Sequence, residues 1–137
     1  MKRRKFLLAL GVVPPLLQAC ASDLPVPTTP TIFTGTVINE NDKPIKDFNV
    51  FFTGDTGGFN PKSTFELRTQ TDEKGYYYLE KLIPTGTIGI TFKPEGNSIY
   101  TPGLYDFLCL VNGVYQSPIP WITGKRNEFN FKIFKRK

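Results

Sequence analysis

The sequence predicts an all-β protein built as a sandwich of two sheets. Apolar and polar residues alternate over 48–52, 88–92 and 129–133, which is the pattern of half-buried strands. Turn signals rich in glycine, proline, asparagine and aspartate separate these stretches. No run keeps helical spacing for the ten or so residues that a secure helix needs. Together these observations favour two packed sheets over any helical class.

We predict about seven strands, taken in order along the chain. Gly35 lies inside the first, where a missing side chain permits close packing or a bulge. Pro44 sets the turn into the second. Asp72 and Gly75 close a hairpin before the fourth, with the glycine at a positive φ and the aspartate capping the turn. The predicted strands are near residues 32–39, 46–53, 64–71, 75–81, 87–93, 105–111 and 127–134.

The first twenty residues have the layout of an export signal. A basic head at residues 2–5 precedes an apolar run at 6–17, which is too short to span a bilayer comfortably. Residues 17–20, Leu-Gln-Ala-Cys, resemble the lipobox of bacterial lipoproteins. We therefore expect a lipoprotein signal peptide at 1–19, lipidation of Cys20, and a proline-rich tether over 20–31 that leads into one domain at 32–137. An ordinary signal peptide with an incidental cysteine is the alternative.

The export route stays open between the general and the twin-arginine pathways. Arg3 and Arg4 resemble the core of a twin-arginine signal. A lipid-anchored protein of the periplasmic side is expected either way. The outer membrane is preferred because Ala21, and not aspartate, follows Cys20.

Charge and composition exclude several classes of function. Four of the 17 basic residues lie in the signal head, so the expected mature chain is almost balanced and makes nucleic acid an unsuitable partner. The chain contains no histidine, which excludes Ser-His-Asp and Cys-His catalysis and histidine-ligated metals within it. If Cys20 is lipidated, Cys109 is left in an apolar run as a small buried hydrophobe. We expect no disulfide and no cofactor.

An ordered set of short motifs resembles the carboxypeptidase regulatory-like domain. The set runs from Thr34-Gly-Thr-Val through Thr71-Asp-Glu-Lys-Gly-Tyr-Tyr to Leu82-Ile-Pro-Thr-Gly, over roughly residues 32–93. The resemblance implies a transthyretin-like (prealbumin-like) Greek-key β-sandwich. It also implies an accessory or binding module and not an enzyme.

Three groups of residues are candidate sites. Five aromatic residues are candidates for a platform that binds sugar rings or an apolar protein surface, although such residues also fill cores: Tyr77, Tyr100, Tyr105, Tyr115 and Trp121. Asp55, Thr56 and Asn60 offer oxygens to calcium, but an ordinary hairpin connection is the stronger reading. The carboxylate pairs Asp72–Glu73 and Glu80–Glu95 are weak candidates for glycoside hydrolysis.

The C-terminal region carries a concentration of basic residues. It could contact anionic phospholipid or lipopolysaccharide, or it could be the solvated end of an edge strand. The residues are Lys125, Arg126, Lys132, Lys135, Arg136 and Lys137.

The sequence therefore predicts a membrane-anchored, non-catalytic envelope lipoprotein that binds a partner protein or a glycan. Two alternatives within binding are a carbohydrate-binding accessory domain and the transthyretin-like lipoprotein of type VI secretion systems. A remote alternative is a degenerate relative of the intradiol ring-cleavage dioxygenases, which share a β-sandwich with a similar aspartate-to-glycine turn. Their iron requires two histidines, so any such relative would lack the iron site.

Overall fold

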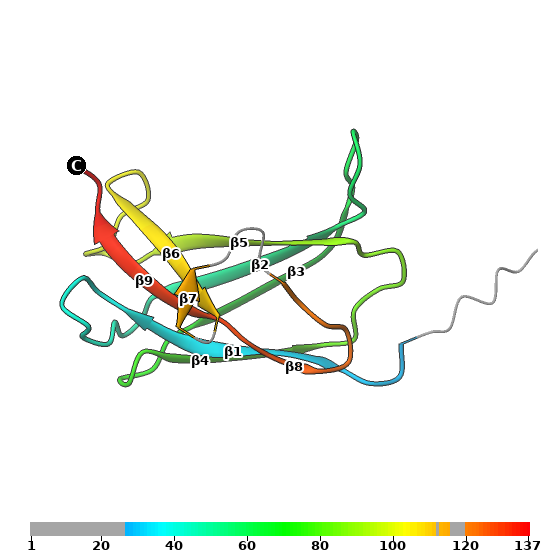
Figure 1. The fold of residues 1–137 in the computed structure, drawn as a ribbon, viewed down its shortest axis with the longest axis horizontal. Coiled ribbons are helices and arrows are strands. Elements are labelled where there is room, and N and C mark those ends of the chain that lie inside the picture. The colour runs from blue at the N-terminus through cyan, green and yellow to red at the C-terminus, as the bar shows by residue number, and fades with distance from the viewer. Residues whose placement is uncertain (1–26, 112, 116–119) are drawn as a thin grey trace, which may run out of the picture.

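The computed structural model describes residues 27–111, 113–115 and 120–137, and these form nine strands and no helix (Figure 1). No segment in this described part is a helix that could cross a membrane. The predicted signal peptide, Cys20 and most of the predicted tether lie outside it. The strands are β1 (Thr31–Ile38), β2 (Asn49–Asp55), β3 (Ser63–Gln70), β4 (Tyr76–Lys81), β5 (Gly89–Gly96), β6 (Tyr105–Val111), β7 (Val114–Tyr115), β8 (Arg126–Glu128) and β9 (Asn130–Lys135).

The strands form two sheets that pack face to face, so the predicted all-β sandwich is confirmed. One sheet has the order β4-β1-β9-β6-β7, with β8 also alongside β1. The other has the order β3-β2-β5. β1 pairs with β4 antiparallel but with β8 and β9 parallel, so the C-terminal segment lies beside the N-terminal strand.

The core between the sheets is mainly aromatic. Phe52 of β2 lies at its centre, with ring centroids 5.2 Å from Phe33 and 5.3 Å from Phe92. Phe92 also stacks on Phe131 across the sheets, at 3.6 Å between centroids. Each such side chain removes a large apolar area from water, which makes this cluster the main source of stability.

The last predicted strand is divided in two at Phe129. We predicted one strand over 127–134, but β8 pairs with β1 at Ile32–Thr34 and β9 pairs with β1 only from Val37. The interruption falls opposite Gly35, where an added Cβ would collide with the Phe129 carbonyl oxygen. The predicted role of Gly35 as a site of close approach is therefore confirmed.

The turn at 72–75 has the predicted chemistry but a different place. Gly75 has φ 71°, and the Asp72 carboxylate accepts hydrogen bonds from the amides of Lys74 and Tyr76 at 2.8 and 2.9 Å. The predicted hairpin is wrong, however, because β3 and β4 belong to different sheets. The turn instead carries the chain from one sheet to the other.

Two further differences concern strand limits. β7 was not predicted, because only two residues pair and the segment around them lacks alternation. The predicted strand at 87–93 includes Ile88 on its apolar side, but β5 begins at Gly89 and Ile88 is 70% exposed.

The sandwich has two distinct ends. The described chain enters at Pro27, beside the start of β1, and we call this side the entry end; it also holds the loops at 56–62, 82–88 and 120–125. At the opposite side, the far end, lie the loops at 39–48, 71–75 and 97–104 and the end of β9. Figure 1 shows the C-terminus at the far end and the start of the described chain, in blue, at the entry end.

Candidate functional site

The five candidate aromatic residues do not form one surface, and Tyr77 is not on a surface at all. Its side chain is 1% exposed, because the alternation on β4 turns it towards the opposite sheet, 6.1 Å from the Phe52 ring. Its hydroxyl donates a hydrogen bond of 2.7 Å to the Phe129 carbonyl. Burial raises the pKa of Tyr77 well above its usual value. Tyr77 is a core residue, and its proposed place in a binding platform is wrong.

Tyr115 and Trp121 lie apart from the other candidates. Tyr115 is exposed on β7, opposite Leu110. Trp121 is half-buried and packs against the core in the loop that leads to β8, at the entry end. Neither is near the start of β6, where Tyr105 pairs with Lys135.

Tyr100 and Tyr105 are brought together at the far end. Their rings meet edge to face with centroids 5.0 Å apart, and the Tyr100 hydroxyl accepts a long hydrogen bond of 3.4 Å from Asn39. With Phe48 and Phe107 they line a small hollow of about 20 Å³, enough for about one water molecule. The pair is thus half-buried and fixed in orientation.

Asn97 fixes the loop that carries Tyr100. Its side-chain oxygen accepts hydrogen bonds from the amides of Ile99 and Tyr100 at 2.9 and 2.7 Å. Its side-chain nitrogen donates to the Lys46 carbonyl at 3.2 Å, which ties this loop to the neighbouring one. Between the two loops, residues 44–47 and 97–100 line an open pocket of about 370 Å³, a size typical of small ligand sites.

Two exposed aliphatic side chains border this region. Ile99, which lines the pocket, is 69% exposed, and Leu104, just before β6, is 60% exposed. The far end therefore combines a rigid pocket, a half-buried aromatic pair and apolar surface.

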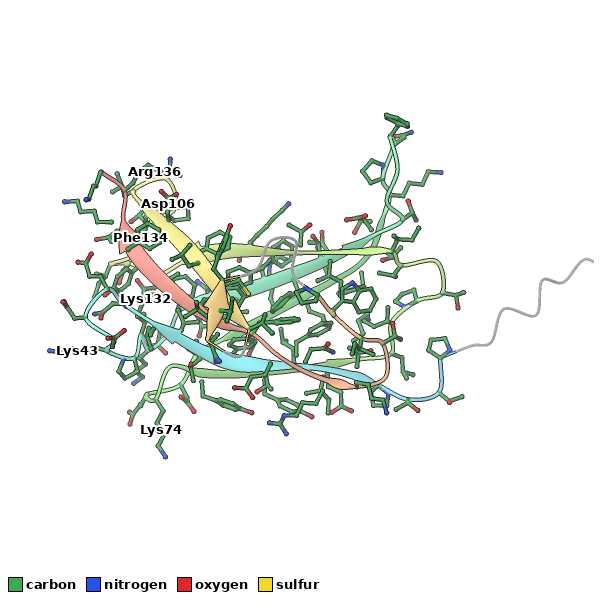
Figure 2. The ribbon with its side chains drawn as sticks, in the orientation of Figure 1. Lys43, Lys74, Asp106, Lys132, Phe134 and Arg136 are labelled. Atoms are coloured by element: carbon green, nitrogen blue, oxygen red, sulfur yellow. The ribbon has the colours of Figure 1, made fainter. Side chains whose placement is uncertain are left out.

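The predicted basic C-terminal region is split between the two ends. Lys125 and Arg126 lie at the entry end, whereas the other four basic residues lie at the far end. Two of those four are paired: Arg136 donates to Asp106 through Nε at 3.1 Å and Nη2 at 2.6 Å, and Lys132 contacts Asp42 at 2.8 Å. Figure 2 shows Arg136, Asp106 and Lys132 at this end. Hydrogen bonding from Arg136 lowers the pKa of Asp106.

The oxygens proposed for calcium are used by the β2–β3 hairpin. Asp55 accepts a hydrogen bond from the Gly57 amide at 2.8 Å, and the Thr56 hydroxyl accepts one from the Lys62 amide at 3.0 Å. Asn60 is exposed in the same hairpin. Among the described residues no group of three or more acidic, cysteine or histidine side chains could hold a metal ion.

The candidate carboxylate pairs are engaged elsewhere. Glu73 pairs with Lys46 at 3.4 Å while Asp72 caps its turn. Glu80 accepts a hydrogen bond from the Tyr78 hydroxyl at 2.7 Å on β4. Glu95 pairs with Arg68 on the other sheet. The structure thus assigns these carboxylates to turns and surface pairs.

Cys109 is buried in the core, 3% exposed, as predicted for a small hydrophobe. Burial raises the pKa of its thiol to about 11. Such a thiol is almost entirely protonated at neutral pH and reacts slowly.

Sequence reasoning missed the residues that shape the far end. Asn97 holds the loop through three hydrogen bonds of its side chain. The Gly96-Asn97 turn sequence before an aromatic residue is the signal that could have identified it. Gly96 has φ 70°, and a side chain there would collide with the Tyr100 carbonyl oxygen.

Comparison with known proteins yields distant likenesses only. No protein-family model and no curated protein matches the sequence. The structure is similar to 3-chlorocatechol 1,2-dioxygenase from Rhodococcus opacus 1CP, with TM-score 0.41 and 13% identity over 79% of this chain and 61% of that chain. This chain thus spans about three fifths of the length of that dioxygenase.

A second solved structure is the dioxygenase domain of a dioxygenase carbohydrate-binding protein fusion from Streptomyces sp. SirexAA-E. It gives TM-score 0.39 and 16% identity over 81% of this chain and 82% of that chain. Neither likeness assigns a family or an activity to this chain.

Proposed function

We propose that this chain is a lipid-anchored, non-catalytic envelope lipoprotein whose β-sandwich binds a partner near the membrane. The lipobox-like sequence that ends at Cys20 carries the proposal. It is supported by the position of Pro27, where the described chain enters at one end of the sandwich while the pocket lies at the other. A tether of about ten residues in extended conformation would reach some 30 Å. We place the protein on the periplasmic side of the envelope, with the outer membrane preferred.

Within this proposal the domain is a transthyretin-like Greek-key sandwich of the carboxypeptidase regulatory-like type. The ordered motifs support this, because two of their glycines have structural reasons to be there. Gly35 makes room for the Phe129 carbonyl, and Gly75 takes a positive φ where a side chain would approach the Val37 carbonyl to 2.6 Å. These roles are scaffolding roles, which fits an accessory module.

The far end is the proposed partner site, and its chemistry favours a protein over a glycan. Tyr100 and Tyr105 meet edge to face and are half-buried, whereas a sugar ring needs an open aromatic face to stack on. The large hydrophobic side chains exposed at this end are aliphatic, namely Ile99 and Leu104, and they lie with exposed polar side chains such as Lys46. Apolar side chains around a rigid pocket are typical of protein interfaces. A glycan is the second candidate.

The anchor is tested with wild type, Cys20→Ser and, as a matched control, Cys109→Ser. Cells that express the full chain are labelled with radioactive palmitate, and membranes are floated on a density gradient. Wild type and Cys109→Ser are expected to carry label and float, whereas Cys20→Ser loses both. A Cys20→Ser protein that stays on membranes at high salt would contradict the anchor.

The partner site is tested by placing a photo-crosslinking amino acid at Leu104, and at Glu66 on β3 as a control. Both positions are exposed, so neither change should disturb folding. A defined protein adduct is expected from position 104 alone. If isolated cell-wall glycan captures the wild type and Ile99→Asp abolishes this capture, the far end binds a glycan and the proposal of a protein partner is wrong.

A further inference from the structure

The entry end exposes large apolar side chains on three separate loops. Phe59, at the tip of the β2–β3 hairpin, is fully exposed. Leu82 and Ile88, on the connection between β4 and β5, are 50% and 70% exposed, and Ile122, before β8, is 64% exposed. Scattered single exposures are common on proteins, but several at one end are not.

These loops adjoin one another. Gly57 lies against Ile88, so that a Cβ there would be 3.3 Å from Ile88 Cγ2. The Thr87 hydroxyl hydrogen-bonds the Thr64 hydroxyl at 2.8 Å, which ties the β4–β5 connection to the start of β3. Pro27, the turn at 83–87 and Thr123 surround a shallow pocket of about 170 Å³. The loops that carry the apolar side chains therefore adjoin one another at one end of the sandwich.

The exposure of Phe59 is built into an ordered hairpin. The Thr56 amide donates to the Lys62 carbonyl at 3.0 Å, and the Lys62 amide donates to the Thr56 hydroxyl at 3.0 Å. Asp55 holds the Gly57 amide in addition. Figure 1 shows this hairpin standing clear of the two sheets. These bonds hold the base of the hairpin, so Phe59 is carried on an ordered loop while its side chain contributes no buried area to the fold.

The chain outside the described residues sets how far this face can be from Cys20. Pro27 lies at the entry end, and only six residues lie between it and Cys20, which makes seven Cα–Cα steps. At full extension these span at most about 25 Å. A lipid on Cys20 would therefore keep the entry end, and not the far end, next to the bilayer.

We propose that the entry end docks on the phospholipid surface of the membrane that holds the lipid; this rests on the anchor proposed above. Phe59, Ile88 and Ile122 enter the boundary between headgroups and acyl chains, as apolar side chains of interfacial proteins do. Lys62 and Lys125, exposed at the same end, face the anionic phosphates. The far-end pocket then points away from the membrane.

The test places an environment-sensitive fluorophore on a cysteine introduced at Phe59→Cys, with Ile99→Cys at the far end as the matched control. Both sites are highly exposed. Cys20 is blocked by its lipid in this scheme, and Cys109 is buried with a high thiol pKa, so the new thiol takes the label. The lipidated full chain is reconstituted into vesicles of phosphatidylethanolamine and phosphatidylglycerol, with and without a lipid-borne quencher.

We expect the label at position 59 to shift to the blue on reconstitution and to lose emission with the quencher. The label at position 99 should do neither. Flotation of the same samples reports the anchor separately. A chain that floats with an unshifted label at 59, or with equal quenching at both positions, contradicts docking while leaving the anchor intact. A chain that does not float contradicts the anchor and, with it, the docking.

Discussion

The two ends of the sandwich are fixed by the same kind of interaction but present different surfaces. At the far end, buried Thr71 holds the loop before β2: its hydroxyl donates to the Ile45 carbonyl at 2.5 Å and accepts from the Phe48 amide at 3.0 Å. At the entry end, buried Asn127 accepts from the Ile122 amide at 2.7 Å and donates to the Lys125 carbonyl at 3.0 Å. Buried polar side chains therefore make both sets of loops rigid.

What differs is the surface that each rigid end displays. At the far end Tyr100 and Tyr105 pack on each other, so the exposed hydrophobic side chains there are the aliphatic Ile99 and Leu104. Three cations of this end are paired with carboxylates. The entry end leaves Phe59 and Ile122 in solvent. Because its backbone is held, this exposure does not come from a loose loop. We have proposed different surroundings for the two ends, namely a partner at the far end and a lipid surface at the entry end, and the variants below compare how the two ends are held.

The largest effect is expected from Gly35→Ala, which acts between the two ends. The added methyl group would collide with the Phe129 carbonyl oxygen and approach the buried Tyr77 hydroxyl, so there is little room to relax. We expect a loss of about 3 kcal/mol or more in the free energy of unfolding, at the upper range for overpacking. Denaturant unfolding followed by the emission of the single tryptophan measures it.

The control for this substitution is Gly86→Ala. Gly86 has φ 90°, but an added Cβ would meet nothing within 4 Å. It should cost only the conformational strain, about 1 kcal/mol. Equal losses from the two variants would contradict a contact at Gly35. If hydrogen exchange of far-end amides gives the same free energy of unfolding as the tryptophan emission, the two ends unfold as one unit.

The next effect compares the ends directly through two buried threonines. Thr71→Val removes two hydrogen bonds and leaves the Phe48 amide and the Ile45 carbonyl without partners. Thr31→Val, at the entry end, removes only the bond of 2.8 Å from the Gly124 amide. We expect losses of about 2–4 and about 1 kcal/mol respectively, given the usual cost of an unpaired buried group.

Thermal and denaturant unfolding of both variants measure the difference. Threonine and valine have nearly the same shape, so packing changes little and the hydroxyl is the variable. If Thr31→Val costs as much as Thr71→Val, the loss does not follow the number of hydrogen bonds that each hydroxyl makes.

The fold could be predicted because its signals are local. Alternation on β1, β2 and β9 places Phe33, Phe52 and Phe131 in the core, and a period of two does so without knowledge of the partner strand. Gly35 and Gly75 were identified for the same reason, since a glycine inside a strand or at a turn has few explanations. The course of the chain between sheets at 72–75 was not predicted, because the turn chemistry is the same whether the flanking strands pair or separate.

The sites could be predicted much less well, because exposure depends on contacts between distant residues. Tyr77 and Tyr100 were both candidates for one aromatic surface, but Tyr77 faces the opposite sheet and Tyr100 lies on a loop held by Asn97. The basic C-terminal region looked continuous in sequence. Its division followed from β8 and β9, which place Lys125 and Arg136 at opposite ends.

The smallest effect concerns the pairing of Asp106 with Arg136, which fixes the C-terminus to the far end. The pKa of Asp106 is lowered in the folded protein by its hydrogen bonds from Arg136. The unfolded carboxyl has a pKa of about 3.9, so the pairing stabilises the fold above that pH and ceases to do so as the pH falls through the lower, folded value. Asp106→Asn should therefore lower Tm slightly at pH 7 and leave it unchanged near pH 2, where wild type and variant carry the same charge.

Because both side chains are solvent-exposed, the shift in Tm at pH 7 is expected to shrink as salt is added. A double-mutant cycle with Arg136→Gln, followed by calorimetry across this pH range, isolates the pair. A coupling that persists at pH 2 would mean that Asp106 acts at the far end through packing and not through its charge.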